Sequence, residues 1–136
     1  MNRSTLLRIA SVLSFLFAAG HSLGGLKSWS PMPDNDVFQA MKSVAFDLNG
    51  TSRTYLDFYL GFGWTISVFL LLQAIVLWQL AALAKKPGIE LRPVIVSFLA
   101  ASLALALLSW KFILFIPTLF AVVIAVVLGL AARRPG

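Results

Sequence analysis

Two ionisable residues of this chain are candidates for chemistry, namely His21 and Asp57. His21 is the only histidine and lies late in a long apolar run, whereas Asp57 opens another such run. Ionisable side chains at membrane depth are costly, usually paired and often functional. If the two runs cross a membrane in opposite directions, both side chains lie near the same outer surface. We therefore expect a His21–Asp57 pair.

This pair has two alternative roles. It either binds a ligand or handles protons, or it is structural, in which case the pair, or His21 with a tyrosine hydroxyl or a loop carbonyl, ties the loop to the helices. Metal or haem ligation needs more ligands than one histidine provides in a chain without cysteine, so we predict no metal and no cofactor. No catalytic residue is predicted either, because the adjacent His21 and Ser22 do not face each other in a helix.

Further polar and aromatic residues extend this candidate site. Trp29, Met41, Tyr59 and Trp64 belong to the same predicted outer region, and we expect them to line a pocket with the pair. Gly61-Phe62-Gly63 lies in an apolar helix with no preceding strand, so it predicts close helix approach and not dinucleotide binding. In the second run, Gln73 and Gln79 are candidates for hydrogen bonds between helices.

The elements that must position these residues are membrane-spanning helices. Of the 136 residues, 60% are hydrophobic and 12% are charged, whereas a water-soluble domain carries about 25% charged residues. Four apolar stretches each reach the roughly 17–25 residues that cross a bilayer, at about 6–26, 55–84, 93–110 and 112–132. We therefore predict a single all-α transmembrane domain over 1–136, a four-helix bundle. A tight turn at Trp110-Lys111 joins the last two helices, with Pro117 either opening or kinking the fourth.

Small residues predict the faces along which these helices pack. Ala10, Ser14 and Ala18 share a face of the first helix with His21. In the third helix, Ser97, Ala101 and Ala104 form a similar ridge. Small residues let helices approach closely in lipid.

A short amphipathic helix is predicted in the first outer loop. Over 36–48 the apolar residues fall on one helix face. Asp36 and Gln39 resemble a capping box, and Asn49-Gly50 is a candidate C-cap. About 13 residues rise only about 20 Å, too little to span a bilayer. We expect this helix to lie in the interface, either covering apolar surface or closing a ligand pocket. Phe46 does not fit, because it points to the polar side.

Lysine and arginine set the predicted orientation. A cytoplasmic N-terminus places seven of them inside, Arg3, Arg8, Lys85, Lys86, Arg92, Arg133 and Arg134, and four outside, Lys27, Lys42, Arg53 and Lys111. We therefore predict both termini in the cytoplasm, in a bacterial inner membrane. The alternative is a cleaved signal peptide, with 9–17 as its apolar core and 18–20 as its cleavage site. The net charge of +6 forms no basic stripe, so no nucleic-acid partner is predicted.

The order of these elements resembles the small bacterial four-helix membrane proteins of DoxX-like layout. The resemblance rests on three segments: His21-Ser22-Leu23-Gly24, the loop from Pro31 to Met41, and Asp57-Phe58-Tyr59-Leu60-Gly61-Phe62-Gly63. It implies an accessory subunit of a membrane redox system. No quinone or sulfur-chemistry signature accompanies the resemblance, so the role is assigned to no residue.

Three functions remain open. The first is a binding or accessory protein whose outer-leaflet pocket holds a lipid-like or small apolar molecule. The second is a small homo-oligomeric transporter, although no acidic residue lies near the predicted midplane. The third is a lipid-modifying enzyme. Membrane lipid, further copies of the chain or a partner membrane subunit are the predicted partners.

Overall fold

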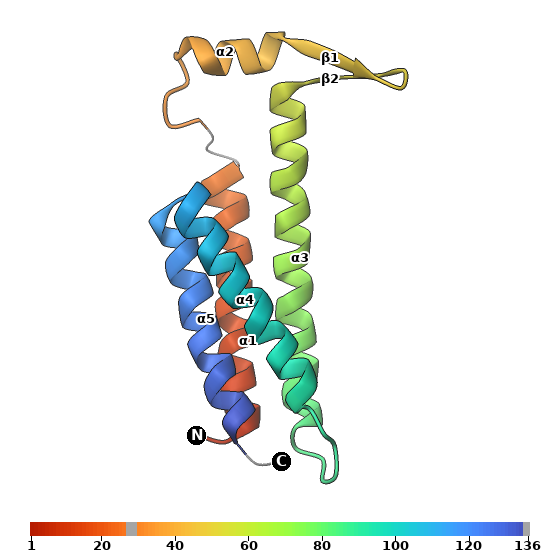
Figure 1. Ribbon diagram of the computed structural model, residues 1–136, viewed down its shortest axis with the longest axis vertical. Helices are drawn as coiled ribbons and strands as arrows, with labels where there is room; N and C mark the ends of the chain where they lie inside the picture. The colour runs from red at the N-terminus through yellow and green to blue at the C-terminus, as the bar shows by residue number, and fades with distance from the viewer. Residues whose placement is uncertain (27–29, 135–136) are drawn as a thin grey trace. The chain divides into compact units, whose positions relative to one another are not determined.

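A computed structural model of the protein describes residues 1–26 and 30–134 (Figure 1). In chain order, its elements are α1 (Arg3–Gly20), a π-helix η1 (His21–Leu26), α2 (Asp36–Ser43), β1 (Ala45–Leu48), β2 (Thr51–Thr54), α3 (Tyr55–Leu83), α4 (Arg92–Phe112) and α5 (Phe115–Arg133). Four helical segments are long and apolar enough to cross a membrane: Arg3–Leu26, Tyr55–Leu83, Arg92–Phe112 and Phe115–Arg133. The four predicted apolar helices are therefore confirmed, and their length and composition are compatible with those of an integral membrane protein.

The chain divides into two compact units. The first, which we call the bundle unit, comprises Met1–Phe17 and Leu70–Gly136. It contains most of α1, the second half of α3, and both α4 and α5. The second, the loop unit, is Ala18–Phe69. It contains the end of α1, η1, α2, the two strands and the first half of α3.

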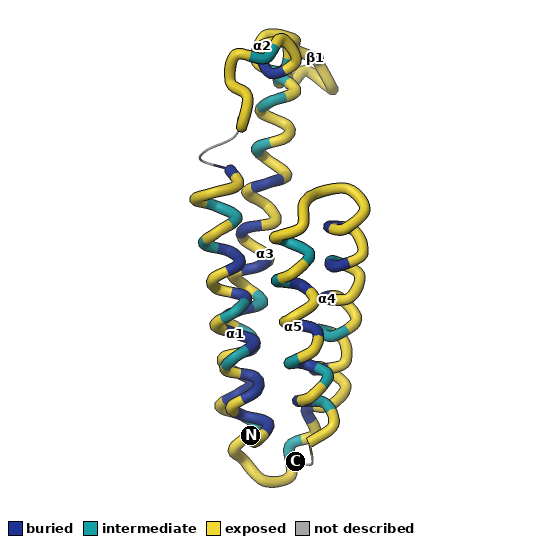
Figure 2. The backbone as a smooth tube through the Cα atoms, turned by 90° about the vertical axis from the view of Figure 1, so that its left-hand side faces the viewer, coloured by how far each residue is buried: buried dark blue, intermediate teal, exposed yellow. Residues whose placement is uncertain are grey.

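Buried and exposed positions alternate along the helices of the bundle unit (Figure 2). Small residues are buried together with some large apolar ones, such as Leu7, while many other large apolar residues are exposed. Ala10 and Ser14 of α1 are fully buried, as the sequence predicts. Large side chains such as Leu107 and Phe115 point outward, with 60% and 74% of their surfaces exposed. This pattern suits a lipid solvent, which solvates large apolar side chains while small ones permit close helix packing.

The predicted packing ridge of α4 is on the wrong face. Ser97, Ala101 and Ala104 are exposed. The small residues that α4 buries are instead Ser102, Ala106 and Ser109. Helices α4 and α5 pack along each other (Figures 1 and 2), and α5 buries Ala121 and Ala125 among its own small residues. Both ridges of α4 have helical spacing, so spacing alone does not identify the one that is buried.

The link between α4 and α5 is tight but lies later than predicted. Helix α4 continues to Phe112, and only Ile113 and Leu114 separate it from α5. Pro117 is the third residue of α5. The first four N–H groups of a helix have no intrahelical partner, so the missing N–H of Pro117 costs no helical hydrogen bond there. Pro117 therefore belongs to the opening turn of α5, so it opens this helix, as in the first of the two predicted alternatives.

Side-chain hydrogen bonds join α1 to α3 within the bundle unit. The Ser4 hydroxyl donates to the Ala81 carbonyl at 2.7 Å, and the Ser11 hydroxyl donates to the Ala74 carbonyl at 2.6 Å. Gln73 Nε2 donates to Ser14 Oγ at 2.9 Å, as predicted for a glutamine of this helix. The two serine bonds are buried and the Gln73 bond is partly buried, and together they fix the register of the two antiparallel helices.

Replacing Ser11 by alanine tests this contribution. Ser11→Ala removes a buried bond between helices, and such bonds are worth about 0.6 kcal/mol on average in membrane proteins. We expect a lower unfolding midpoint in detergent for Ser11→Ala than for Ser97→Ala, whose exposed hydroxyl bonds only to Pro93 of its own helix. Equal midpoints for the two variants contradict this assignment.

The loop unit contains a β-hairpin where the sequence predicts helix. Helix α2 ends at Ser43, and β1 pairs antiparallel with β2. Asn49 and Gly50 form the turn between them, with φ of 53° and 78°. Positive φ at both central residues is the geometry of a type I′ hairpin turn, which Asn-Gly favours. The predicted helix over 36–48 is therefore correct only to Ser43, and Asn49-Gly50 is not its C-cap.

Two details of the predicted helix also change. The N-cap is Asn35, whose side chain accepts the N–H of Val37 at 2.8 Å. Gln39 donates to the Pro33 carbonyl and forms no capping box with Asp36. The misfit of Phe46 is explained because it belongs to β1, where its ring lies 5.1 Å from the Tyr55 ring.

Substitution of Gly50 tests the hairpin. Gly50→Val places a β-branched side chain at positive φ, which costs roughly 1–2 kcal/mol, and two-stranded hairpins are only marginally stable. We expect trypsin to cleave severalfold faster after Arg53 of β2. Thr51→Val is the control, because valine suits a strand. An unchanged cleavage rate in Gly50→Val argues against the turn.

Candidate functional site

His21 lies in the loop unit at the start of η1, where it contacts α3. Its Nδ1 atom is 3.0 Å from Ser67 Oγ, and the Ser22 hydroxyl donates to the same oxygen at 2.9 Å. Ser67 is buried. These three side chains form a hydrogen-bonded cluster between η1 and the first half of α3.

Asp57 caps the start of α3. Its Oδ2 atom accepts the N–H of Thr54 at 2.9 Å, and its own N–H donates to Thr54 Oγ1 at 3.1 Å. This reciprocal pair has the pattern of a capping box. A carboxylate in the first helical turn also interacts favourably with the helix dipole. The polar bonds of Asp57 are therefore local to its own helix end.

The structure does not bring His21 and Asp57 together. Ser67, the partner of His21, follows Asp57 by ten residues, which is about 15 Å along α3. The prediction placed both residues at the same depth, on the assumption that the loop joins two helices of equal height. Instead, about three turns of α3 precede Ser67, the residue at which this helix contacts His21.

The other predicted pocket residues that the structure describes lie on α2 and α3 of the loop unit. Trp29 lies outside the described residues. Met41 is half-buried on α2. Tyr59 and Trp64 are exposed on α3, and five residues of helix turn their side chains about 140° apart. The outer-leaflet pocket therefore stays a prediction.

The His21–Ser67 contact fits a structural role better than catalysis. A serine nucleophile does need a base at about 3 Å. However, only 7% of Ser67 is exposed, and its oxygen already accepts a hydrogen bond from Ser22. The cluster satisfies buried polar groups between two helical segments. This matches the structural role considered for His21, with Ser67 as its hydrogen-bond partner.

Gly63 is the glycine that allows close approach on α3. A Cβ atom at Gly63 overlaps the side chain of Leu26, which is itself buried at the end of η1. A Cβ at Gly61 meets no atom within 4 Å. Of the two glycines in the predicted Gly61-Phe62-Gly63 motif, only Gly63 packs against another helical segment in the described residues.

Leucine at each glycine gives a matched test. Gly63→Leu forces Leu26 and its helix away from α3, and overpacking of this kind costs about 1–3 kcal/mol. We expect a lower unfolding midpoint in detergent for Gly63→Leu and a nearly unchanged one for Gly61→Leu. The assignment is wrong if Gly61→Leu destabilises the protein as much as Gly63→Leu.

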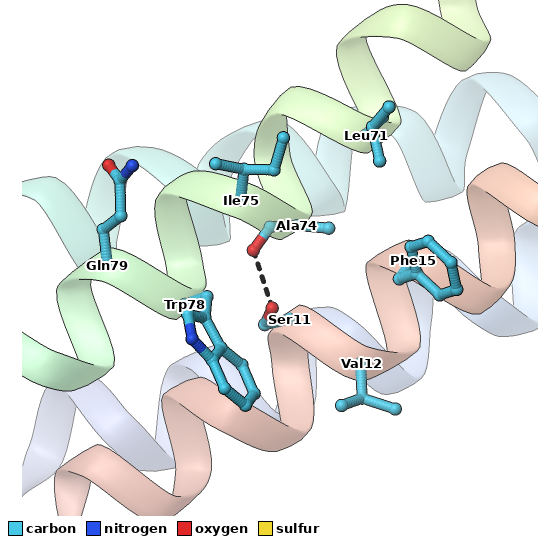
Figure 3. A pocket seen from close by; sticks show the side chains of 8 residues that line it. All are labelled: Ser11, Val12, Phe15, Leu71, Ala74, Ile75, Trp78 and Gln79. Atoms are coloured by element: carbon cyan, nitrogen blue, oxygen red, sulfur yellow. Dashed lines mark hydrogen bonds between the residues drawn. The ribbon is translucent and has the colours of Figure 1, made fainter.

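An apolar groove lies between α1 and α3 in the bundle unit (Figure 3). It has a volume of about 430 Å³. Three residues of α1 and five of α3 line it: Ser11, Val12, Phe15, Leu71, Ala74, Ile75, Trp78 and Gln79. The groove is open along one side.

The floor and walls of the groove differ in size. Ser11 and Ala74 form the floor, and both are buried. Because the Ser11 hydroxyl donates to the Ala74 carbonyl (Figure 3), the floor presents no unsatisfied polar group from this pair. Large apolar side chains such as Phe15 and Ile75 form the walls and are about half exposed. Small floor residues between large wall residues leave a channel along the helix pair.

The two ends of the groove are lined by different residues. Trp78 and Gln79 lie at this end, whereas Phe15 and Leu71 lie at the other (Figure 3). The guanidinium carbon of Arg8 lies 4.8 Å from the centre of the Trp78 ring, which is within cation–π range. In the sequence, Arg8 contributed only to the predicted orientation. The sequence signal for this face is the helical spacing of Arg8, Ser11, Val12 and Phe15 along α1.

A second hollow lies on the first turns of α3 in the loop unit. Its volume is about 380 Å³, and it is lined by Arg53, Asp57, Phe58, Gly61, Phe62 and Thr65. All but Arg53 come from a single helix, so this hollow is a shallow helix face. It combines one cation and one carboxylate that is already bonded to Thr54.

Among residues 1–26 and 30–134, no three histidine, cysteine or carboxylate side chains come close enough to hold a metal ion. No protein-family model, curated protein or solved structure matches this chain.

Proposed function

We propose that this chain is a lipid-binding membrane protein that holds an acyl chain in the groove between α1 and α3. The observation that supports this function is an apolar channel of about 430 Å³ that opens to the side. Ligand sites are concave and mostly apolar, with few polar groups to fix orientation. A hydrocarbon chain matches this lining because it has no group that needs a hydrogen bond.

The predicted orientation of the chain assigns the groove to one leaflet. Arg8 follows the start of α1 by five residues, and Trp78 precedes the end of α3 by five. Each therefore lies about 7.5 Å inside a helix end, where tryptophan and snorkelling arginine meet the headgroup layer. With the N-terminus in the cytoplasm, this is the inner leaflet of the membrane. The proposed site is thus a groove at the N-terminal end of α1, apart from the predicted outer-leaflet pocket.

The contacts favour retention of a lipid over general solvation by lipid. A flat helix surface touches an acyl chain on one side only, whereas the groove touches it from Phe15 on α1 and from Leu71 and Ile75 on α3. Close contacts are individually weak but add up over many atoms. A lipid seated in the groove should therefore remain through purification in detergent while annular lipids exchange.

Filling the groove tests the proposal. Ile75→Trp puts a larger side chain into the channel from an exposed wall position. The expected result is severalfold less lipid bound to the purified protein by native mass spectrometry. Val122→Trp is the control, because Val122 is a similarly exposed position on α5 outside the groove. Equal retention by wild type and Ile75→Trp rejects the groove as the site.

A further inference from the structure

Arg8 is the charged group at the mouth of the groove. Its side chain is exposed, and its guanidinium lies over Trp78, a residue of the groove lining. A ring face beneath the guanidinium fixes its plane and leaves the N–H donors at its edges directed outward. Those donors suit the oxygens of a phosphate, which arginine binds through paired hydrogen bonds.

No side-chain carboxylate in the described bundle unit competes for Arg8. The chain has no Asp or Glu over 1–33 or 58–89, and Glu90 is the single acid of the bundle unit. The Glu90 Oε1 atom accepts the N–H of Arg92 at 2.8 Å at the start of α4. An anion from outside the chain is therefore the natural counterion of Arg8.

The whole end of the bundle unit that contains Arg8 is basic. Ser4 bonds to Ala81 and Arg3 bonds to the Arg134 carbonyl, so the start of α1 lies with the ends of α3 and α5. Seven of the eight lysines and arginines of this unit belong to this end: Arg3, Arg8, Lys85, Lys86, Arg92, Arg133 and Arg134. Basic residues near a membrane surface attract anionic lipids, and they repel the ammonium group of zwitterionic ones.

The order of groups along the groove matches the order of groups in a phospholipid. From the headgroup layer inward, Arg8 and Trp78 come first, the Ser11–Ala74 floor follows, and Phe15 and Leu71 come last. All phospholipids offer similar acyl chains, so the apolar part of the groove does not distinguish among them. Selectivity must therefore come from the charged mouth.

We infer that the groove selects an anionic phospholipid, whose phosphate binds the Arg8 guanidinium over Trp78 while one acyl chain lies between α1 and α3. This inference rests on the proposed function, because it names the class of lipid that the groove holds. The alternative is that Arg8 only snorkels along Trp78 to reach water, in which case its loss leaves lipid preference unchanged.

Competition between two lipids separates these cases. The full-length protein is reconstituted in nanodiscs with equal amounts of phosphatidylglycerol and phosphatidylcholine of the same acyl chains, and retained lipid is measured by native mass spectrometry. Both lipids offer a phosphate to Arg8, but phosphatidylcholine also brings an ammonium group close to the guanidinium. We therefore expect wild type to prefer phosphatidylglycerol about tenfold. Arg8→Gln should reduce this preference to near one while total retained lipid falls much less.

Matched variants identify the source of the preference. Arg92→Gln removes one charge from the same basic end, and Arg92 is not among the groove residues; it should keep the preference within about twofold of wild type. Arg8→Lys keeps the charge and loses the planar fork, so an intermediate preference is expected. It also provides a test if Arg8→Gln fails to fold. If Arg92→Gln lowers the preference as much as Arg8→Gln, the general charge of this end is responsible and Arg8 is not the phosphate ligand.

Two outcomes distinguish failure of this inference from failure of the proposed function on which it rests. If wild type retains both lipids equally and Ile75→Trp retains neither, the groove binds acyl chains but does not select anionic headgroups, and only the inference is overturned. If wild type and Ile75→Trp retain the same small amount of lipid, the proposed function itself fails.

Discussion

Hydrogen bonds from serines of α1 to backbone carbonyls of α3 hold these two helices together in the bundle unit. Lipid solvates apolar side chains as well as other helices do, so burial of leucine gives α1 and α3 little reason to associate. Ser4 and Ser11 are seven residues apart, as are their acceptors Ala81 and Ala74, so both bonds form on one face of each helix. Small side chains at these positions bring the backbones together, and the large residues beside them then stand as walls around a channel. The groove is thus a consequence of how the helices are held.

The sequence predicts the number and approximate ends of the long helices, because continuous apolar stretches of this length have few other uses. The sequence predicts less well which face of each helix is buried. The face of α1 with Ala10 and Ser14 is identified correctly, but α4 has small residues on two faces and the wrong one is chosen. In the loop, the apolar residues over 36–48 fit one helix face, and this fit hides the Asn49-Gly50 turn signal. A local turn with positive φ at both residues prevails there over helical periodicity.

The candidate site depends on features that no local pattern contains. The pairing of His21 with Ser67 instead of Asp57 follows from the register of two antiparallel helices, and a shift of three turns leaves the composition of both unchanged. Arg8 and Trp78 are 70 residues apart in the chain, so their contact requires the relative rotation of α1 and α3. The sequence therefore contains the residues of the groove, but which of them come together depends on the fold.

The two-residue link of Ile113 and Leu114 makes α4 and α5 a single helical hairpin. With no polar spacer between them, the two helices cannot separate far, and both bury small residues, among them Ala106 and Ala125. Lys111 is the only charged residue over 93–132, and its position near the end of α4 lets its ammonium group extend away from the apolar helices by snorkelling. If this hairpin crosses a membrane with the link leading, Lys111 is the one charge that has to be carried with it.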